Sequence, residues 1–300
     1  MKKKTYLIAL MAMALTLGSC SDNENGIGGE TSKYITVSTS IGNMTRVATD
    51  EKGGQTFEEG DEISVYAWTG DATVAPETRE RVVNNAINKL TNGSWVSTPQ
   101  MLWKNNRDKH YFIGVYPTAA ISDLSAGEYT FDETKQVESD LLVAVNKDGL
   151  SYNVDEQQTV PLTFTHVMAK LAVNLTYKNQ WGGIPTVEKV VVGNAAKEAT
   201  INYLTKVVTP STTAKEDFSL PEITENTKYV SVIIPQEEVT QLTIVIGGKN
   251  FVYDNGTPFK LESGKITTVN LEVGRDEIKL GDVKITNWED GSTFSGEALN

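Results

Sequence analysis

The chain changes from one strand-like segment to another within Pro161–Tyr177, PLTFTHVMAKLAVNLTY. In the first part Leu162 and Phe164 share one face, and threonines occupy the other. From Leu171 the alternation of apolar and polar residues begins again. No Gly or Pro separates the two segments, so this junction is short and stiff rather than a flexible linker. We therefore predict two domains with separate cores, residues 32–167 and 168–300, divided at about Val167.

The composition is typical of an all-β protein. Thr, Val and Ile recur throughout the 300 residues, and strand-like runs come every ten or so residues. Turn pairs punctuate these runs, among them Asn92-Gly93, Gly247-Gly248 and Asn255-Gly256. The pattern predicts antiparallel β-sandwiches, and the chain is long enough for each half to bury an apolar core.

The net charge of −12 disfavours binding to nucleic acid, because an acidic surface repels phosphates. The charge becomes more negative if the first nineteen residues are removed, since Lys2, Lys3 and Lys4 are removed with them. We therefore expect no nucleic-acid partner.

The N-terminus has the features of an export signal. A basic start is followed by the apolar run Tyr6–Leu17, which is short for a membrane span, and then by LGSC ending at Cys20. LGSC resembles a lipobox, in which the cysteine thiol receives a lipid. We predict that residues 1–19 are a lipoprotein signal peptide and that Cys20 anchors the protein to the outer membrane. The alternative is an ordinary signal peptide with an incidental cysteine.

A polar tether is expected next, because residues 20–31 contain almost nothing to bury. Its acidic run resembles the surface-export signal of Bacteroidota lipoproteins. The first strand follows at Lys33–Ile41, with Ile35 and Val37 on one side. The segment Gly42–Thr56 then contains Arg46, which composition alone suggests is a solvated loop residue.

Further strands are predicted from alternation and aromatic content. Arg81–Leu90 has apolar residues at helical spacing, but its asparagines and the following Asn92-Gly93 favour a strand that returns as a hairpin. His110–Pro117 is apolar on both faces, as expected of a central strand. Thr209–Thr213 is predicted to be a loop. The other expected strands are Phe57–Trp68, Asp140–Val145, Thr159–Thr165, Leu171–Tyr177, Val187–Val192, Thr200–Leu204, Tyr229–Pro235, Leu242–Gly247, Lys249–Tyr253, Lys265–Val273 and Lys279–Trp288.

Motifs that would indicate catalysis or metal binding are absent from the sequence. His110 and His166 are the only histidines, each without metal-ligand spacing, so both are expected to be packing or hydrogen-bonding residues. Acidic neighbours such as Glu58-Glu59 could form an acid/base pair for glycoside hydrolysis, yet among 39 acidic residues such pairs are expected by chance. No GxSxG or phosphate-binding loop is present. We expect neither enzymatic activity nor a cofactor or metal.

Several stretches together resemble the fimbrillin-like family of Bacteroidota, the subunits of type V pili and related surface lipoproteins. They follow the family's order from the export signal almost to the C-terminus. The matching stretches are LGSC, FEEGDEISVYAW, YFIGVYP, SDLLVA, PLTFTHVMAKLAVNL, VIIPQ, LESGKITTVNLEV and IKLGDVKITNWEDG.

The resemblance implies two tandem transthyretin-like antiparallel β-sandwich domains and export as a lipoprotein. For polymerising members it also implies proteolytic removal of the first strand after an Arg or Lys. Arg46 matches that site in kind, and cleavage there would leave Val47 as the new N-terminus. The uncovered groove would then accept a strand from another subunit by β-augmentation.

Three functions remain open at this stage. The first is a fimbrial subunit or accessory component that pairs with other subunits or with itself, located in the fimbrium if it polymerises. The second is a non-polymerising surface lipoprotein that binds glycan or host matrix on an aromatic face, and the third is an enzyme. The tail after Trp288 is short and polar, so a donor strand would have to come from residues 277–288 or be absent.

Overall fold

The computed structural model describes residues 33–42, 56–153, 158–276 and 278–288. In this part the chain is almost entirely β-strand, which confirms the all-β fold class. Two short 3-10 helices, η1 (Thr78–Glu80) and η2 (Asn179–Trp181), are the only helices within the described ranges.

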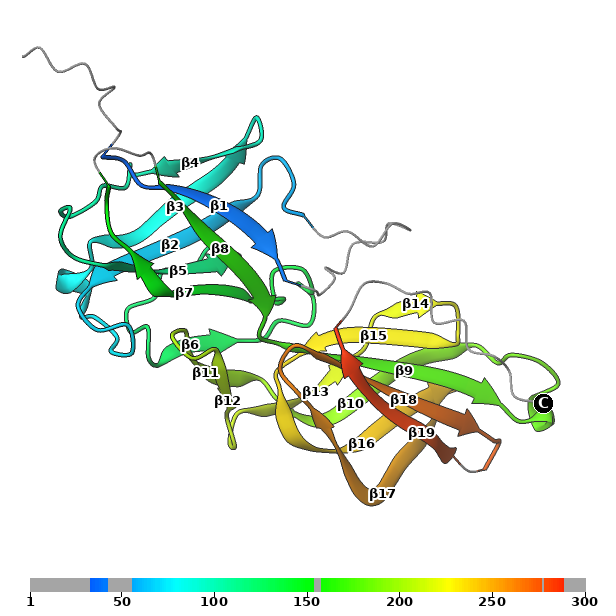
Figure 1. The fold of residues 1–300 in the computed structure, drawn as a ribbon. Coiled ribbons are helices and arrows are strands. Elements are labelled where there is room, and N and C mark those ends of the chain that lie inside the picture. The colour runs from blue at the N-terminus through cyan, green and yellow to red at the C-terminus, as the bar shows by residue number, and fades with distance from the viewer. Residues whose placement is uncertain (1–32, 43–55, 154–157, 277, 289–300) are drawn as a thin grey trace, which may run out of the picture. The chain divides into compact units, whose positions relative to one another are not determined.

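The first half forms a seven-stranded sheet in the order β1-β8-β7-β5-β2-β3-β4 (Figure 1). Its strands are β1 (Thr36–Ile41), β2 (Glu62–Thr69), β3 (Val83–Thr91), β4 (Ser94–Thr98), β5 (His110–Tyr116), β7 (Leu142–Leu150) and β8 (Thr159–His166). All neighbours are antiparallel except β1 and β8, which run parallel.

Local sequence explains much of this sheet. The strand expected at His110–Pro117 is β5, which lies between β7 and β2 and buries both faces. The ambiguous segment at Arg81–Leu90 forms β3, as predicted. Asn92 (φ 51°) and Gly93 (φ 72°) make the turn from β3 to β4, and two positive φ angles match the right-handed twist of the paired strands.

Most of the second half belongs to two sheets, ordered β13-β10-β16-β17 and β14-β15-β9-β18-β19. Within the second of these, β9 and β18 run parallel. The strands are β9 (Ala169–Tyr177), β10 (Val187–Ala196), β13 (Lys215–Ser219), β14 (Glu222–Thr224), β15 (Lys228–Ile233), β16 (Gln236–Ile246), β17 (Lys249–Leu261), β18 (Lys265–Val273) and β19 (Ile278–Asn287). Apolar residues from both sheets share one core.

A small third sheet connects the two halves. Its order is β12-β11-β6, with β6 (Gly127–Thr130), β11 (Glu198–Asn202) and β12 (Val207–Pro210). The pairing of β6 with β11 joins strands on opposite sides of Val167. Because β12 includes Thr209 and Pro210, the prediction of a loop at Thr209–Thr213 is wrong for those two residues.

Two apolar clusters form the core. The smaller lies on one face of the seven-stranded sheet and includes Val65, Phe112 and Phe164. The larger combines residues from the other face of that sheet, such as Trp68 and Val115, with the core of the second half. The expectation of fully separate cores is therefore wrong, because buried side chains are continuous across residue 167. The domain boundary and the transthyretin-like assignment stay predictions.

Candidate functional site

The first strand, β1, occupies the edge of the seven-stranded sheet. It pairs with β8 alone among the described strands, in a parallel register that runs from Thr36 opposite Thr159 to Ile41 opposite Phe164 (Figure 1). The β-branched residues of this segment favour strand conformation. As an edge strand, β1 has backbone groups on one side that pair with no other described strand. Because β1 is an edge strand, its departure breaks pairing with only one described strand, β8.

Alternation along β1 divides its side chains between core and solvent, as predicted. Ile35, which precedes the strand, and Val37 are buried and belong to the smaller apolar cluster, together with Leu162 and Phe164 of β8. On the outer face, the hydroxyl of Ser40 lies 3.1 Å from that of Thr163. The strand therefore covers apolar side chains of β8 as well as its backbone edge.

A groove of about 690 Å³ runs along β1 and reaches Thr159 at the start of β8. Strand β4, the opposite edge of the same sheet, contributes to its lining. The indole Nε1 of Trp95 donates a hydrogen bond to Thr39 Oγ1 at 3.0 Å. Near the start of β1, the amide of Ile35 donates to the carbonyl of Met101 at 2.9 Å. These contacts bring the two edges of the curved sheet, β1 and β4, close to each other.

The residues predicted for lipidation and for proteolytic cleavage cannot be placed relative to β1. Cys20, Arg46 and Val47 all lie outside the described residues. Lipidation of Cys20 and cleavage after Arg46 stay predictions.

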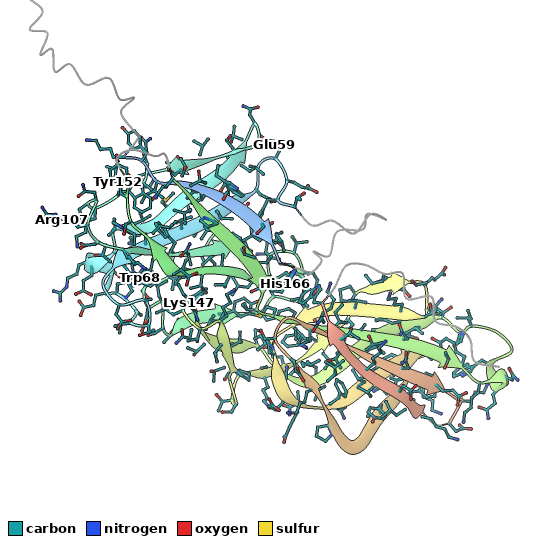
Figure 2. The ribbon with its side chains drawn as sticks, in the orientation of Figure 1. Glu59, Trp68, Arg107, Lys147, Tyr152 and His166 are labelled. Atoms are coloured by element: carbon teal, nitrogen blue, oxygen red, sulfur yellow. The ribbon has the colours of Figure 1, made fainter. Side chains whose placement is uncertain are left out.

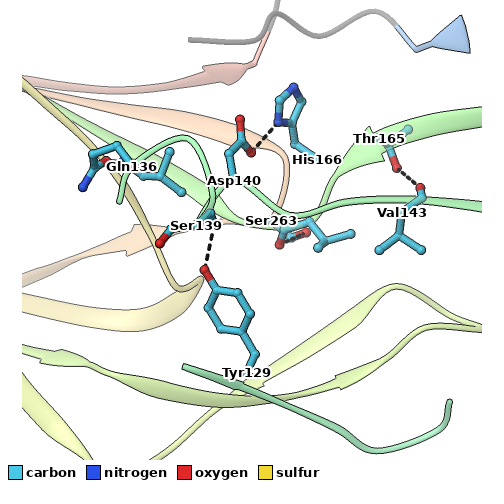
Figure 3. A network of polar contacts seen from close by, with 10 residues as sticks. Tyr129, Gln136, Ser139, Asp140, Val143, Thr165, His166 and Ser263 are labelled. Carbon is cyan, nitrogen blue, oxygen red and sulfur yellow. Dashed lines mark hydrogen bonds and ion pairs between the residues drawn. The ribbon is translucent and has the colours of Figure 1, made fainter. Parts of the chain in front are cut away.

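A buried polar cluster lies where β8 leads into β9. His166 Nδ1 is 2.6 Å from a carboxylate oxygen of Asp140, and both side chains are buried (Figure 3). The fully buried indole of Trp288 stacks on the His166 ring. The Lys170 ammonium lies 4.3 Å from the centroid of the same Trp288 ring. Burial lowers the pKa of Lys170 to about 8, because the interior penalises its charge. The neighbouring Ser139 accepts a hydrogen bond from Tyr129 Oη through its carbonyl, at 2.7 Å.

The two histidines have the structural roles predicted for them. His166 belongs to the cluster above, while His110 Nε2 accepts a hydrogen bond from the amide of Lys104 at 3.1 Å. Burial lowers the pKa of His110. The described residues contain no grouping of three or more His, Cys, Asp or Glu side chains suited to a metal ion. No helix in these ranges is long and apolar enough to cross a membrane.

The segment considered as a strand donor is engaged within its own fold. Ile278–Asn287 forms β19, which pairs with β18 from Lys265 to Val273. Trp288 follows directly and is fully buried. In this arrangement β19 completes a sheet of the second half.

The comparison with protein families decides what kind of protein this is. Residues 45–288 match the family model described as Fimbrillin-like. The chain belongs to the fimbrillin-like family. This fimbrillin-like chain is also 24% identical over 315 aligned positions to a Bacteroides uniformis protein named "Putative fimbrium subunit Fim1C", covering 97% of each sequence.

Solved structures of other proteins share the fold of this fimbrillin-like chain. One is a "putative cell adhesion protein" from Bacteroides ovatus, with a TM-score of 0.63, 16% identity, and coverage of 85% of this chain and 98% of that one. Another is a fimbrial protein from Bacteroides vulgatus, with a TM-score of 0.53, 12% identity, and coverage of 86% and 100%. These similarities show that the fold is shared.

Proposed function

We propose that this fimbrillin-like chain is a fimbrial subunit or accessory component that accepts a strand from another subunit after its own first strand has been removed. The observation that carries the proposal is the placement of β1. It pairs with one described strand only, yet its inner face covers apolar core. Cleavage after Arg46 is the event that would release it.

Loss of β1 has a large energetic consequence for the rest of the sheet. Burial of Ile35 and Val37 stabilises the fold by about 1.5–3 kcal/mol for each side chain. Removal would expose Leu162 and Phe164 and leave the outer backbone groups of β8 unpaired. An extended segment with alternate apolar side chains would satisfy both requirements at once.

Export as a lipoprotein is part of the same proposal. Cys20 would carry the lipid and hold the chain at the outer membrane, with the remainder exposed at the cell surface. Partners would be other fimbrial subunits or a second copy of this chain. Donation of β19 would require that strand to leave β18 and Trp288 to leave its buried position. Acceptance of a strand therefore requires less rearrangement than donation, and pairing between two copies of this chain would require β19 of one copy to be released as well.

Limited trypsin digestion tests the proposal directly. The purified protein should yield a fragment that begins at Val47, and oligomers should appear only after this cut. Arg46→Ala should remain monomeric, whereas Arg107→Ala, which changes an exposed loop arginine, should behave as the wild type. A cut protein that stays a stable monomer would refute strand acceptance. In that case the alternative, a non-polymerising surface lipoprotein that binds glycan or host matrix, would account better for the fold.

A further inference from the structure

A cavity of about 790 Å³ opens on the first half of the chain, apart from β1. The end of β2, the segment from residue 69 to 76, Arg79–Val82 and the segment 102–104 line it. Trp68, labelled in Figure 2, and Trp103 are buried in its wall, while Val74 and Leu102 are exposed. The volume is that of a small-molecule site.

Two cations of this cavity have only neutral hydrogen-bond partners among the described residues. Lys104 Nζ donates to Thr69 Oγ1 at 3.1 Å and forms no ion pair there. Arg81, which is 8% exposed, donates to the carbonyls of Ile121 and Ser122, each at 2.6 Å. Its third partner is the side-chain oxygen of Asn84 at 2.8 Å.

The charge of Arg81 is poorly compensated. Its Nε is buried and has no hydrogen-bond partner. Burial lowers the pKa of the guanidinium, because desolvation outweighs the attraction of Tyr66 and Asp123. The carboxylate of Asp123 is itself bonded to the hydroxyl of Ser125 at 2.6 Å. An anion in the cavity would therefore gain from the field of Arg81 even without touching it.

The cavity also contains hydrogen-bond acceptors. The carboxylates of Asp71 and Glu80 line it, and each accepts from a nearby backbone amide, Asp71 from Thr73 and Glu80 from Glu77. Each carboxylate retains lone pairs for hydroxyl donors. A simple anion would interact with the cations but would donate no hydrogen bonds to these carboxylates. A polyhydroxylated acid would interact with the cations through its carboxylate and with the acceptors through its hydroxyl groups.

We propose that this cavity binds an acidic saccharide, a sugar ring that carries a carboxylate. The carboxylate of the sugar accepts a charge-assisted hydrogen bond from Lys104. The positive charge of Arg81 attracts the same carboxylate from a longer distance. Sugar hydroxyls donate to Asp71 and Glu80, and the apolar face of the ring packs against the side of Leu102.

An extended peptide fits this cavity less well than a sugar. Most of the wall is loop and 3-10 helix, and the amide of Val82 is already bonded to the carbonyl of Ala67 at 2.8 Å. A bound peptide would find no long free strand edge for main-chain pairing. The ligand is therefore a compact molecule.

If the protein is adhesive, this site identifies its ligands as acidic saccharides. Saccharide binding does not depend on strand exchange. Titration of the monomeric protein with saccharide measures the site, whereas oligomer formation after proteolysis measures strand acceptance. Either result can fail without the other. Arg46→Ala should leave saccharide binding unchanged.

Calorimetric titration with methyl glucuronide and methyl glucoside tests the proposal, because these sugars differ only in the carboxylate. The glucuronide should bind at least about tenfold more tightly, and the difference should shrink as salt rises. Lys104→Gln should remove most of the preference, because only the field of Arg81 then remains. The matched control Lys109→Gln, whose ammonium bonds instead to the Asp148 carbonyl, should retain it.

A second variant tests the apolar side of the cavity. Leu102→Glu places a charge on an exposed rim, so the fold should persist while glucuronide binding falls at least about tenfold. Equal affinity for the two sugars would overturn the proposal, as would an unchanged preference in Lys104→Gln. Acetate binding as tightly as glucuronide would reduce the cavity to a simple anion site. Tighter binding of an oligoglutamate peptide would reassign it to a protein partner.

Discussion

The Trp288 indole stacks on the His166 imidazole, with ring centroids 4.0 Å apart and planes inclined by 17°. One residue lies at the junction of the two halves and the other follows the last strand, β19. The backbone supports the contact, because the Trp288 amide donates to the Gly264 carbonyl and the Gly264 amide to the Met168 carbonyl. The end of β19 is thereby fixed beside the junction.

Trp288 is the principal apolar anchor of this strand. Most other β19 side chains are exposed, including Val283 and Ile285. Trp288→Ala should lower the free energy of unfolding by about 3–5 kcal/mol, because a fully buried indole leaves a cavity. The matched control Val283→Ala should lower it by less than about 1 kcal/mol. Urea denaturation measures both values, and similar losses would contradict the anchoring role.

Hydrogen exchange provides a second test of the same anchor. In Trp288→Ala the amides of β18 that pair with β19 should exchange faster, because the edge strand opens locally. Amides of β5, a central strand of the first half, should keep their protection. Uniform acceleration in both regions would indicate global destabilisation instead.

The contact between Asp140 and His166 should be strongly coupled. Either Asp140→Ala or His166→Ala leaves a buried polar group without its partner, at a cost of about 1–3 kcal/mol or more. The double variant should therefore lose less than the sum of the two single losses. A double-mutant cycle in urea measures this coupling, and additive losses would contradict it.

Lys170 should make stability depend on pH. Its folded-state pKa of about 8 lies below the ordinary value of 10.5, because burial penalises the charge. Between these two pH values the unfolded chain binds more protons than the folded protein, so stability rises with pH. The contribution of Lys170 to stability is therefore fully present above about pH 10.5 and is lost as pH falls through about 8. Wild type should therefore gain stability relative to Lys170→Met as pH rises from 7 to 9.5. Parallel curves for the two proteins would show that Lys170 titrates normally.

Lipidation at Cys20 has a direct test. Radiolabelled fatty acid should enter the wild-type protein in cells and should not enter Cys20→Ala, because the thiol is the acceptor. Ser21→Ala keeps the thiol and should be labelled normally. Equal labelling of wild type and Cys20→Ala would leave residues 1–19 as an ordinary export signal.

The second half should depend partly on the first. Residues 168–300 alone lack β6, the partner of β11, and lose core contacts with residues such as Trp68 and Val115. This fragment should unfold at a lower urea concentration than the full chain. Equal midpoints would show that the two halves are independent despite their shared core.

Alternation predicted strands such as β8, in which Val160, Leu162 and Phe164 are buried and the residues between them are not. β5 was predicted because it is apolar on both faces, and β3 because of its asparagines and the following Asn92-Gly93 turn. β6, β13 and β14 were missed because they are short and mostly polar. β6 owes its conformation to pairing with the distant strand β11, whereas β14 pairs with the next strand, β15.

The candidate sites were predictable to a smaller extent. The inner face of β1 followed from its alternation, but its parallel pairing with β8 joins residues more than a hundred positions apart. The burial of Arg81 could not be predicted, because its partners Ile121 and Ser122 come from a distant loop. For the same reason the sequence did not indicate that Trp288 and His166 touch.

The parallel register of β1 and β8 also determines how the first half responds to mechanical force. Thr36 lies opposite Thr159, so the start of β1 and the end of β8 are at opposite ends of the pair. A pull on the chain before residue 36, opposed by a pull beyond His166, therefore slides one strand along the other. The interstrand hydrogen bonds are loaded together in shear rather than opened in turn, so an intact β1 makes the first half of the chain resistant to tension along this path.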